Sequence, residues 1–273
     1  MECFYINLDS AAARRECFEN NFLKNKSDGW TLSRFRAVDA NYIDSHGIAG
    51  ALRPSAKACF ISHKNLIKAN LDSKGHIFLL EDDAEFGKNT CKIIDKFLSN
   101  NKNFEWDILF TDVCVPHLAT MADLISLRHQ LFKKNEITVL NLHGMPFAGS
   151  TAYILNNESK RKFFDFIESE NILNLEYDLY IRKLIYEKKI VGYCFFPFLT
   201  TLSDESESSQ IQKVDSSTTD WIWNMFRKMV WMDRDLNKQK PMLGEIRTKL
   251  CDEESNSFGI LFSAMISEKF LPK

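Results

Sequence analysis

The stretch Ile77-Phe78-Leu79-Leu80-Glu81-Asp82-Asp83 joins four apolar residues directly to three carboxylates. The apolar run predicts a short buried strand, and the carboxylates predict its C-terminal end. In an open α/β sheet, ligands bind in the crevice beyond the carboxyl ends of the strands. Carboxylates that meet there can bind a divalent cation, which can in turn hold a diphosphate. The alternative is a solvated acidic loop, because runs of charge usually lie on the surface.

Strand-like and helix-like segments alternate on both sides of this stretch. Short apolar runs predict strands over residues 3–8, 77–80, 107–111, 150–155 and 190–196. Helical periodicity or helix-forming composition predicts helices over residues 11–24, 56–71, 90–98, 158–167 and 176–188. This alternation predicts an α/β fold with a mostly parallel, Rossmann-type sheet flanked by helices.

The C-terminal part of the chain has a different character. Residues 203–220 are polar and predict a loop, which is either a lid or a linker. After it, Ile222, Met225, Phe226, Met229 and Val230 form one apolar helical stripe. The stripe fits packing against the main domain, a homodimer contact through residues 221–234, or a helix that rests on an anionic membrane. We therefore expect a main domain over residues 1–215 and a helical C-terminal appendage over 216–273.

Composition excludes several classes of protein. A chain of 273 residues with 45% hydrophobic content can bury a sizeable core. The net charge of −2 gives no overall attraction to nucleic acid. The seven cysteines are scattered without a C-x-x-C spacing, which is typical of reduced thiols. Because neither a signal peptide nor a membrane span is evident, we expect a cytoplasmic protein, with peripheral contact to the inner face of the cytoplasmic membrane as a variant.

Four motifs in the first ninety residues occur together in a specific order and spacing. They are Tyr5-Ile6-Asn7-Leu8-Asp9 followed by Arg14-Arg15, Phe35-Arg36-Ala37-Val38-Asp39-Ala40, Ala58-Cys59-Phe60-Ile61-Ser62-His63, and Leu79-Leu80-Glu81-Asp82-Asp83. This set resembles glycosyltransferase family 25, which includes bacterial lipooligosaccharide galactosyltransferases and the catalytic domain of collagen galactosyltransferases. A weaker resemblance continues to about residue 211. The chain departs from the family at Ala56 and Ala58, where a Glu and a Gly are common.

The resemblance implies a GT-A-like fold, with a Rossmann-type mixed sheet flanked by helices and a helical C-terminal appendage. It also implies a nucleotide-sugar donor, inverting transfer and usually a manganese ion, with magnesium as the alternative. It implies that Asp83 and Glu81 bind the metal. The residues expected around the donor are Asn7, Asp9, Arg14, Asp39, His63, Glu81 and Asp82. Inversion needs a base for the acceptor hydroxyl, and only Asp, Glu or His can serve near neutral pH. Asp178 is the expected base and Glu176 its substitute.

The expected activity is transfer of a sugar, with galactose favoured, from a UDP-sugar to a lipooligosaccharide or lipopolysaccharide acceptor that is lipid-linked. A nucleotidyltransferase or phosphotransferase is disfavoured because no G-x-x-x-x-G-K loop is present. The alternative from another class is a nucleotide-sugar-binding or scaffolding protein with weakened catalysis. The Ala at position 56 keeps that alternative open.

Overall fold

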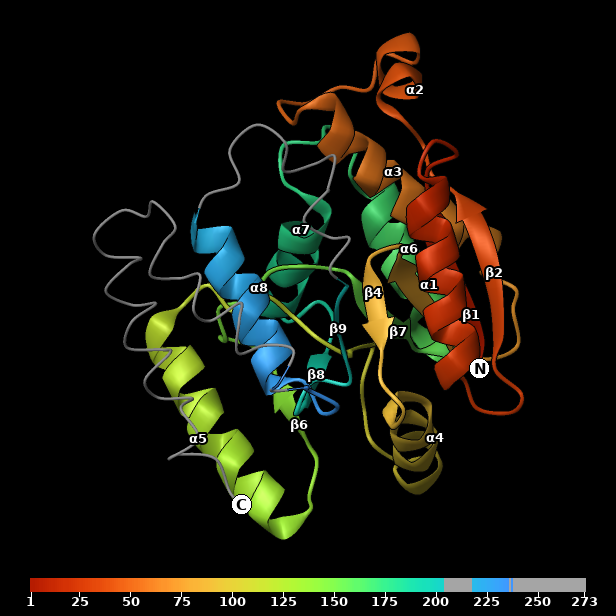
Figure 1. Cartoon of the computed structure of the whole chain (residues 1–273). Coiled ribbons are helices and arrows are strands. Elements are labelled where there is room, and N and C mark those ends of the chain that lie inside the picture. The colour runs from red at the N-terminus through yellow and green to blue at the C-terminus, as the bar shows by residue number, and fades with distance from the viewer. Residues whose placement is uncertain (204–217, 236, 238–273) are drawn as a thin grey trace.

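The computed structural model describes residues 1–203, 218–235 and 237. A central sheet is flanked by helices (Figure 1), and its seven strands follow the order β2-β1-β3-β7-β5-β8-β6. These strands are β1 (Glu2–Asn7), β2 (Thr31–Arg36), β3 (Ile77–Glu81), β5 (Ile108–Phe110), β6 (Thr138–Asn141), β7 (Ala152–Leu155) and β8 (Gly192–Phe196). A second, two-stranded sheet pairs β4 (Ala84–Phe86) with β9 (Thr200–Leu202).

The central sheet is mixed. β1 runs parallel to both β2 and β3, and β5 runs parallel to β8. β7 is antiparallel to β3 and β5, and β6 is antiparallel to β8. The α/β fold with a mixed sheet and flanking helices, which the family resemblance implies, is confirmed. The mostly parallel sheet expected from the alternation of strands and helices is wrong. An apolar run predicts a buried strand without its direction, and β7 is buried along its whole length.

The helices cover both faces of this sheet. They are α1 (Ala12–Asn25), α2 (Ala40–Ser45), α3 (Pro54–Ala69), α4 (Thr90–Asn100), α5 (Leu118–Lys134), α6 (Lys160–Ser169), α7 (Tyr177–Tyr186) and α8 (Thr218–Val230). Strand β3 shows how the core divides, because successive side chains point to opposite faces. Ile77 and Leu79 pack in the core cluster that includes residues of α3, α6 and α7. Phe78 and Leu80 pack in the cluster that includes residues of α1 and α4.

Helix α8 packs against the main domain. Every residue of its apolar stripe is at most 2% exposed. The backbone joins it to the segment after β8, because Phe198 N donates to Val230 O at 3.2 Å and Met232 N donates to Phe198 O at 2.7 Å. The stripe is therefore covered by the chain's own core rather than presented to a membrane or a second subunit. The predicted boundary at residue 215 and most of the predicted loop and appendage lie outside the described residues.

Candidate active site

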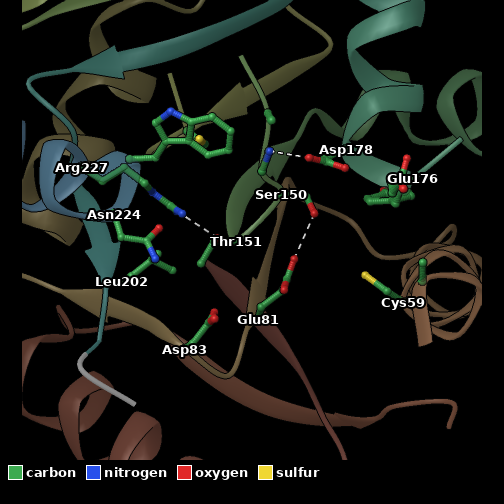
Figure 2. A pocket seen from close by; sticks show the side chains of 16 residues that line it. Cys59, Glu81, Asp83, Ser150, Thr151, Glu176, Asp178, Leu202, Asn224 and Arg227 are labelled. Atoms are coloured by element: carbon green, nitrogen blue, oxygen red, sulfur yellow. Dashed lines mark hydrogen bonds between the residues drawn. The ribbon is translucent and has the colours of Figure 1, made fainter. Parts of the chain in front are cut away.

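Two cavities lie beside the acidic end of β3. The first, here called the Asn7 cavity, has a volume of about 360 Å³ and is lined by Asn7, Arg14 and Asp39 among others. The second, the Asp178 cavity shown in Figure 2, has a volume of about 300 Å³. Three residues line both cavities: Cys59, Glu81 and Asp83. The two cavities therefore share a wall that contains two of the predicted carboxylates.

Most of the predicted site residues meet at this place. His63 and Asp82 join Asn7, Arg14 and Asp39 around the Asn7 cavity. Glu176 and Asp178 line the Asp178 cavity. Asp9 lines neither of the two cavities; it forms ion pairs with Arg34 at 2.5 Å and Arg36 at 2.7 Å near the surface.

The side chain of Asp82 is held by the protein itself. Asn7 Nδ2 donates a hydrogen bond to Asp82 Oδ2 at 2.6 Å, and Arg14 forms an ion pair with Oδ1. Arg34 Nε donates to Asn7 Oδ1 at 2.9 Å and extends the network to β2. Both carboxylate oxygens of Asp82 thus have protein donors, which indicates a role in fixing β1 and α1 beside the cavity.

Asp83 lies in a contrasting environment. Its Oδ1 atom is buried and has no hydrogen-bond partner among the described residues. Arg14 reaches its other oxygen only at 3.8 Å. Burial, followed by repulsion from Glu81, raises the pKa of Asp83 to about 7. A buried carboxylate oxygen without a partner is costly, and a bound cation would remove that cost.

Glu81 is oriented from two sides. Ser150 Oγ donates to Glu81 Oε1 at 3.0 Å, and His63 Nε2 lies 3.6 Å from the same oxygen. Burial acts to raise the pKa of Glu81, but the neighbouring His63 and Ser150 outweigh it and hold that pKa below its usual value. Glu81 therefore offers a charged carboxylate beside Asp83. Oxygen ligands of this kind fit a hard divalent cation such as Mn²⁺ or Mg²⁺.

Asp178 lies in the first turn of α7 and faces the second cavity. The backbone N–H of Gly149 donates to its Oδ2 at 2.6 Å (Figure 2). Gly149 has a φ of +87°, a conformation that other residues adopt rarely, so the glycine allows this contact. Burial raises the pKa of Asp178 despite the hydrogen bonds from the backbone. A carboxylate with a raised pKa suits a general base.

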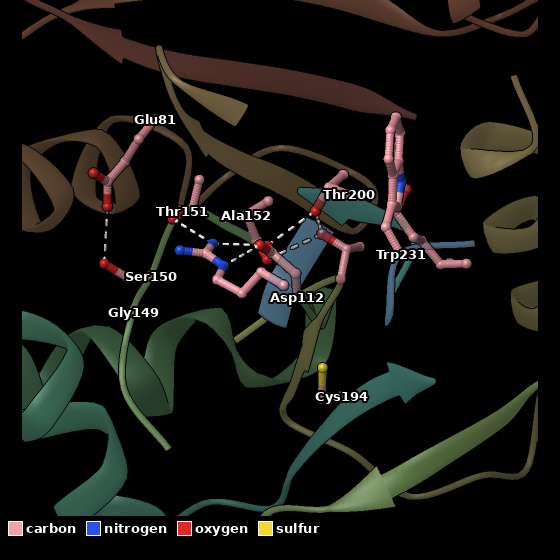
Figure 3. Close-up of polar contacts among 12 residues, drawn as sticks. Glu81, Asp112, Gly149, Ser150, Thr151, Ala152, Cys194, Thr200 and Trp231 are labelled. Carbon is pink, nitrogen blue, oxygen red and sulfur yellow. Dashed lines mark hydrogen bonds and ion pairs between the residues drawn. The ribbon is translucent and has the colours of Figure 1, made fainter. Parts of the chain in front are cut away.

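Helix α8 contributes residues to the same cavity that the sequence alone did not identify. Trp223, Asn224 and Arg227 line it. Arg227 Nε donates to Asp112 Oδ2 at 2.9 Å, and Arg227 Nη2 donates to Thr151 Oγ1 at 2.9 Å. Figure 3 shows the contacts around Asp112, whose other oxygen accepts from Thr200 Oγ1 at 3.0 Å.

The sequence contains a signal for Asp112 but not for Arg227, the two residues that form this buried ion pair. Asp112 follows the predicted strand 107–111 closely, as Asp83 follows the strand at Ile77, so the same rule of an acid at a strand end could have selected it. Arg227 had no comparable signal, because an arginine beside an apolar stripe is usually a solvated charge. In the structure its side chain is only 5% exposed.

Comparisons with known structures find glycosyltransferases at low similarity. GlyE of Streptococcus pneumoniae TIGR4, in its apo form, shares 9% identity at a TM-score of 0.36, over 70% of this chain and 44% of that one. Galactosyltransferase LgtC, in complex with donor and acceptor sugar analogues, shares 11% identity at a TM-score of 0.36, over 68% and 70%. Mouse xyloside xylosyltransferase 1, in its apo form, shares 12% identity at a TM-score of 0.33, over 70% of this chain and 77% of that one. The matched part of the chain covers less than half of that GlyE structure and less than two thirds of a second GlyE structure.

Curated proteins give no significant match. The family model for glycosyltransferase family 25, described as an LPS biosynthesis protein, matches residues 1–181. The match covers all four N-terminal motifs and well over half of the 273 residues, so this chain belongs to glycosyltransferase family 25.

Proposed function

We propose that this chain is an inverting glycosyltransferase that moves a sugar from a UDP-sugar to a saccharide acceptor. Galactose is the favoured sugar, and a lipid-linked lipooligosaccharide or lipopolysaccharide at the inner face of the cytoplasmic membrane is the favoured acceptor. Family membership supports the reaction class. The observation that supports the site most is the shared wall, because a donor in one cavity and an acceptor in the other would meet at Glu81 and Asp83.

The donor is assigned to the Asn7 cavity. Its volume of about 360 Å³ is in the range of small-molecule sites. Asn7 and Arg14 lie at the end of β1 and on the helix that follows it, which is where nucleotides bind in open α/β sheets. A Mn²⁺ or Mg²⁺ ion held by Asp83 and Glu81 would stabilise the negative charge that develops on the leaving diphosphate.

The acceptor is assigned to the Asp178 cavity. Asp178 accepts the proton of the attacking hydroxyl, and its raised pKa strengthens it as a base. The Gly149 N–H holds the carboxylate in position. Trp223 offers an aromatic surface for the apolar side of a sugar ring, and Asn224 offers an amide for its hydroxyl groups.

The second candidate function is a nucleotide-sugar-binding protein with weakened catalysis. One specific observation favours it. Ala56 lines the Asp178 cavity and Ala58 lines the Asn7 cavity, so the two departures from the family pattern both face the site. Compared with the family pattern, Ala56 removes one carboxylate from the lining of the Asp178 cavity.

Two measurements on the full chain separate these functions. Release of UDP is followed across a panel of UDP-sugars, with and without Mn²⁺ and saccharide acceptors, and donor binding is measured by calorimetry. The transferase predicts Mn²⁺-dependent release of UDP from one donor, accelerated by an acceptor. Mn²⁺-dependent donor binding without any release of UDP would contradict it and support the binding protein.

A further inference from the structure

A second set of metal-ligating side chains adjoins the oxygen ligands. Cys59 and His63 lie one turn apart on α3, and Glu81 ends β3. One ligand atom from each lies within 4.8 Å of the other two. All three residues line the Asn7 cavity, so the place between them is accessible to an ion. This set offers sulfur, nitrogen and oxygen, whereas Glu81 and Asp83 offer oxygen alone.

The surroundings of His63 point to a ligand independently of this clustering. The residue is fully buried, and its Nδ1 atom pairs with the Tyr153 hydroxyl at 3.0 Å. Tyr153 in turn pairs with the Tyr177 hydroxyl at 2.7 Å, and the imidazole stacks on the Tyr177 ring at a centroid distance of 4.2 Å. These contacts fix the ring with Nε2 directed towards Glu81.

Nε2 itself is left without a hydrogen bond among the described residues. Its 3.6 Å separation from Glu81 Oε1 is too long for a hydrogen bond. A buried ring nitrogen without a hydrogen bond is costly, and the Glu81 carboxylate lies only at ion-pair distance from it. A histidine that binds a metal through one ring nitrogen is usually held by a hydrogen bond at the other. Nδ1 of His63 has such a bond to Tyr153.

We propose that Cys59, His63 and Glu81 form a soft-metal site of the zinc class. Thiolate and imidazole ligands prefer Zn²⁺ to Mn²⁺ or Mg²⁺, and a carboxylate completes a set of three protein ligands. On binding, the thiol proton of Cys59 passes to solvent and a sulfur–metal bond forms. A water molecule from the cavity would complete a set of four ligands. The site stands on these contacts whether or not the chain transfers sugar.

A consequence for the neighbouring site rests on the proposed function. Glu81 belongs to both ligand sets. A Zn²⁺ ion bound by Cys59, His63 and Glu81 would therefore make Glu81 unavailable to a Mn²⁺ ion at Asp83. Zn²⁺ is therefore expected to oppose Mn²⁺-dependent binding of UDP, and the Cys59→Ala variant should lose this antagonism.

The test uses Co²⁺ as a spectroscopic substitute for Zn²⁺ in the metal-free full chain. One equivalent of Co²⁺ should give a thiolate-to-cobalt charge-transfer band and intense tetrahedral d–d bands, and Zn²⁺ should abolish both. Cys59→Ala should lose the charge-transfer band. His63→Gln should weaken Co²⁺ binding by at least about 10-fold. Loss of a residue that only hydrogen-bonds to a metal ligand already costs about 10-fold or more. Cys17→Ser, which removes an exposed thiol on α1, is the matched control and should keep the band.

Absence of a thiolate band, or a band that persists in Cys59→Ala, would overturn the proposal. Circular dichroism melts of each variant establish that the fold is intact, and Cys59→Ser repeats the test with a side chain of similar size. Calorimetry with Mn²⁺ and UDP on the same wild-type sample keeps the two proposals separate. A cobalt–thiolate band without UDP binding would contradict the donor site alone, and UDP binding without the band would contradict the soft-metal site alone.

Discussion

At the scale of single residues, Asp82 and Asp83 are neighbours in sequence with opposite surroundings. Asp82 is bound by Asn7 and Arg14, whereas Asp83 keeps a buried oxygen without a partner among the described residues. The acidic run at the end of β3 predicts that carboxylates gather there, but it does not distinguish between them. We therefore propose that Asp82 holds Asn7 and Arg14 in place beside the cavity, while Asp83 is the carboxylate that binds the cation.

This difference predicts the effect of removing each charge. Asp83→Asn should abolish Mn²⁺-dependent binding of UDP, because it removes a charged ligand. Asp82→Asn, the matched control, should retain Mn²⁺-dependent binding of UDP. It should lower the free energy of unfolding by about 1–3 kcal/mol, because Asn7 and Arg14 lose a charged acceptor. Calorimetry and urea denaturation measure the two effects. Unchanged UDP affinity in Asp83→Asn would remove Asp83 from the metal site.

Asp83 also predicts a dependence of stability on pH. Its pKa rises from 3.8 to about 7 in the folded state, so between those values the folded chain holds a proton that the unfolded chain has lost. The contribution of this group to the free energy of unfolding is therefore largest below pH 4, falls as the pH rises to 7 and then levels off. Relative to wild type, metal-free Asp83→Asn should gain stability between pH 5 and pH 8, as measured by urea denaturation. A constant difference across that range would contradict the raised pKa.

Asp178 is predicted to act on the chemical step. Asp178→Asn should reduce turnover by about 10²-fold or more while the affinity for donor stays unchanged, because a general base is lost without loss of donor contacts. Glu176→Gln is the matched control, since Glu176 lines the same cavity but is exposed. Initial rates of UDP release with acceptor measure both variants. A large loss in Glu176→Gln with near-native turnover in Asp178→Asn would exchange the two roles.

At the scale of elements, local pattern predicted most of what surrounds the site. The strand at Ile77 and the helix that carries His63 have strong local signals, an apolar run and a proline at a helix start. Helices α2 and α5 and strands β2, β4, β6 and β9 were not predicted. Several are short, and the pairing of β4 with β9 joins segments more than a hundred residues apart. Such pairing depends on tertiary contacts that a local pattern does not contain.

Helix α8 yields a prediction of its own. If Trp223 contacts the acceptor, Trp223→Ala should raise the KM for the acceptor by about 10-fold or more, since aromatic packing of this kind contributes about 1–3 kcal/mol. Hydrolysis of the donor in the absence of acceptor should be unchanged. Trp223→Phe, which keeps an aromatic face, should recover most of the loss. An equal loss of donor hydrolysis and transfer would indicate that the residue supports the fold instead.

At the scale of the whole molecule, the Asp112–Arg227 pair connects α8 to the sheet across 115 positions of the sequence. Both side chains are almost completely buried, at 0% and 5% exposure. The sequence predicted the apolar stripe of α8 and three alternatives for its partner. It could not single out Arg227, because only the folded chain brings Asp112, Thr151 and α8 together. Helix α8, which lies beyond the family match, thereby becomes a wall of the Asp178 cavity.

Removal of either member of this pair should destabilise the protein strongly. Arg227→Met leaves the charge of Asp112 buried, and Asp112→Leu leaves that of Arg227 buried, so each should cost about 3–5 kcal/mol in the free energy of unfolding. The double variant should cost less than the sum of the two, because no uncompensated charge remains. Glu168→Gln, which breaks the more exposed Lys64–Glu168 pair at 2.8 Å, is the control and should cost at most about 1 kcal/mol. Additive losses in the double variant, measured by urea denaturation, would mean that Arg227 holds α8 to the sheet through packing rather than through its charge.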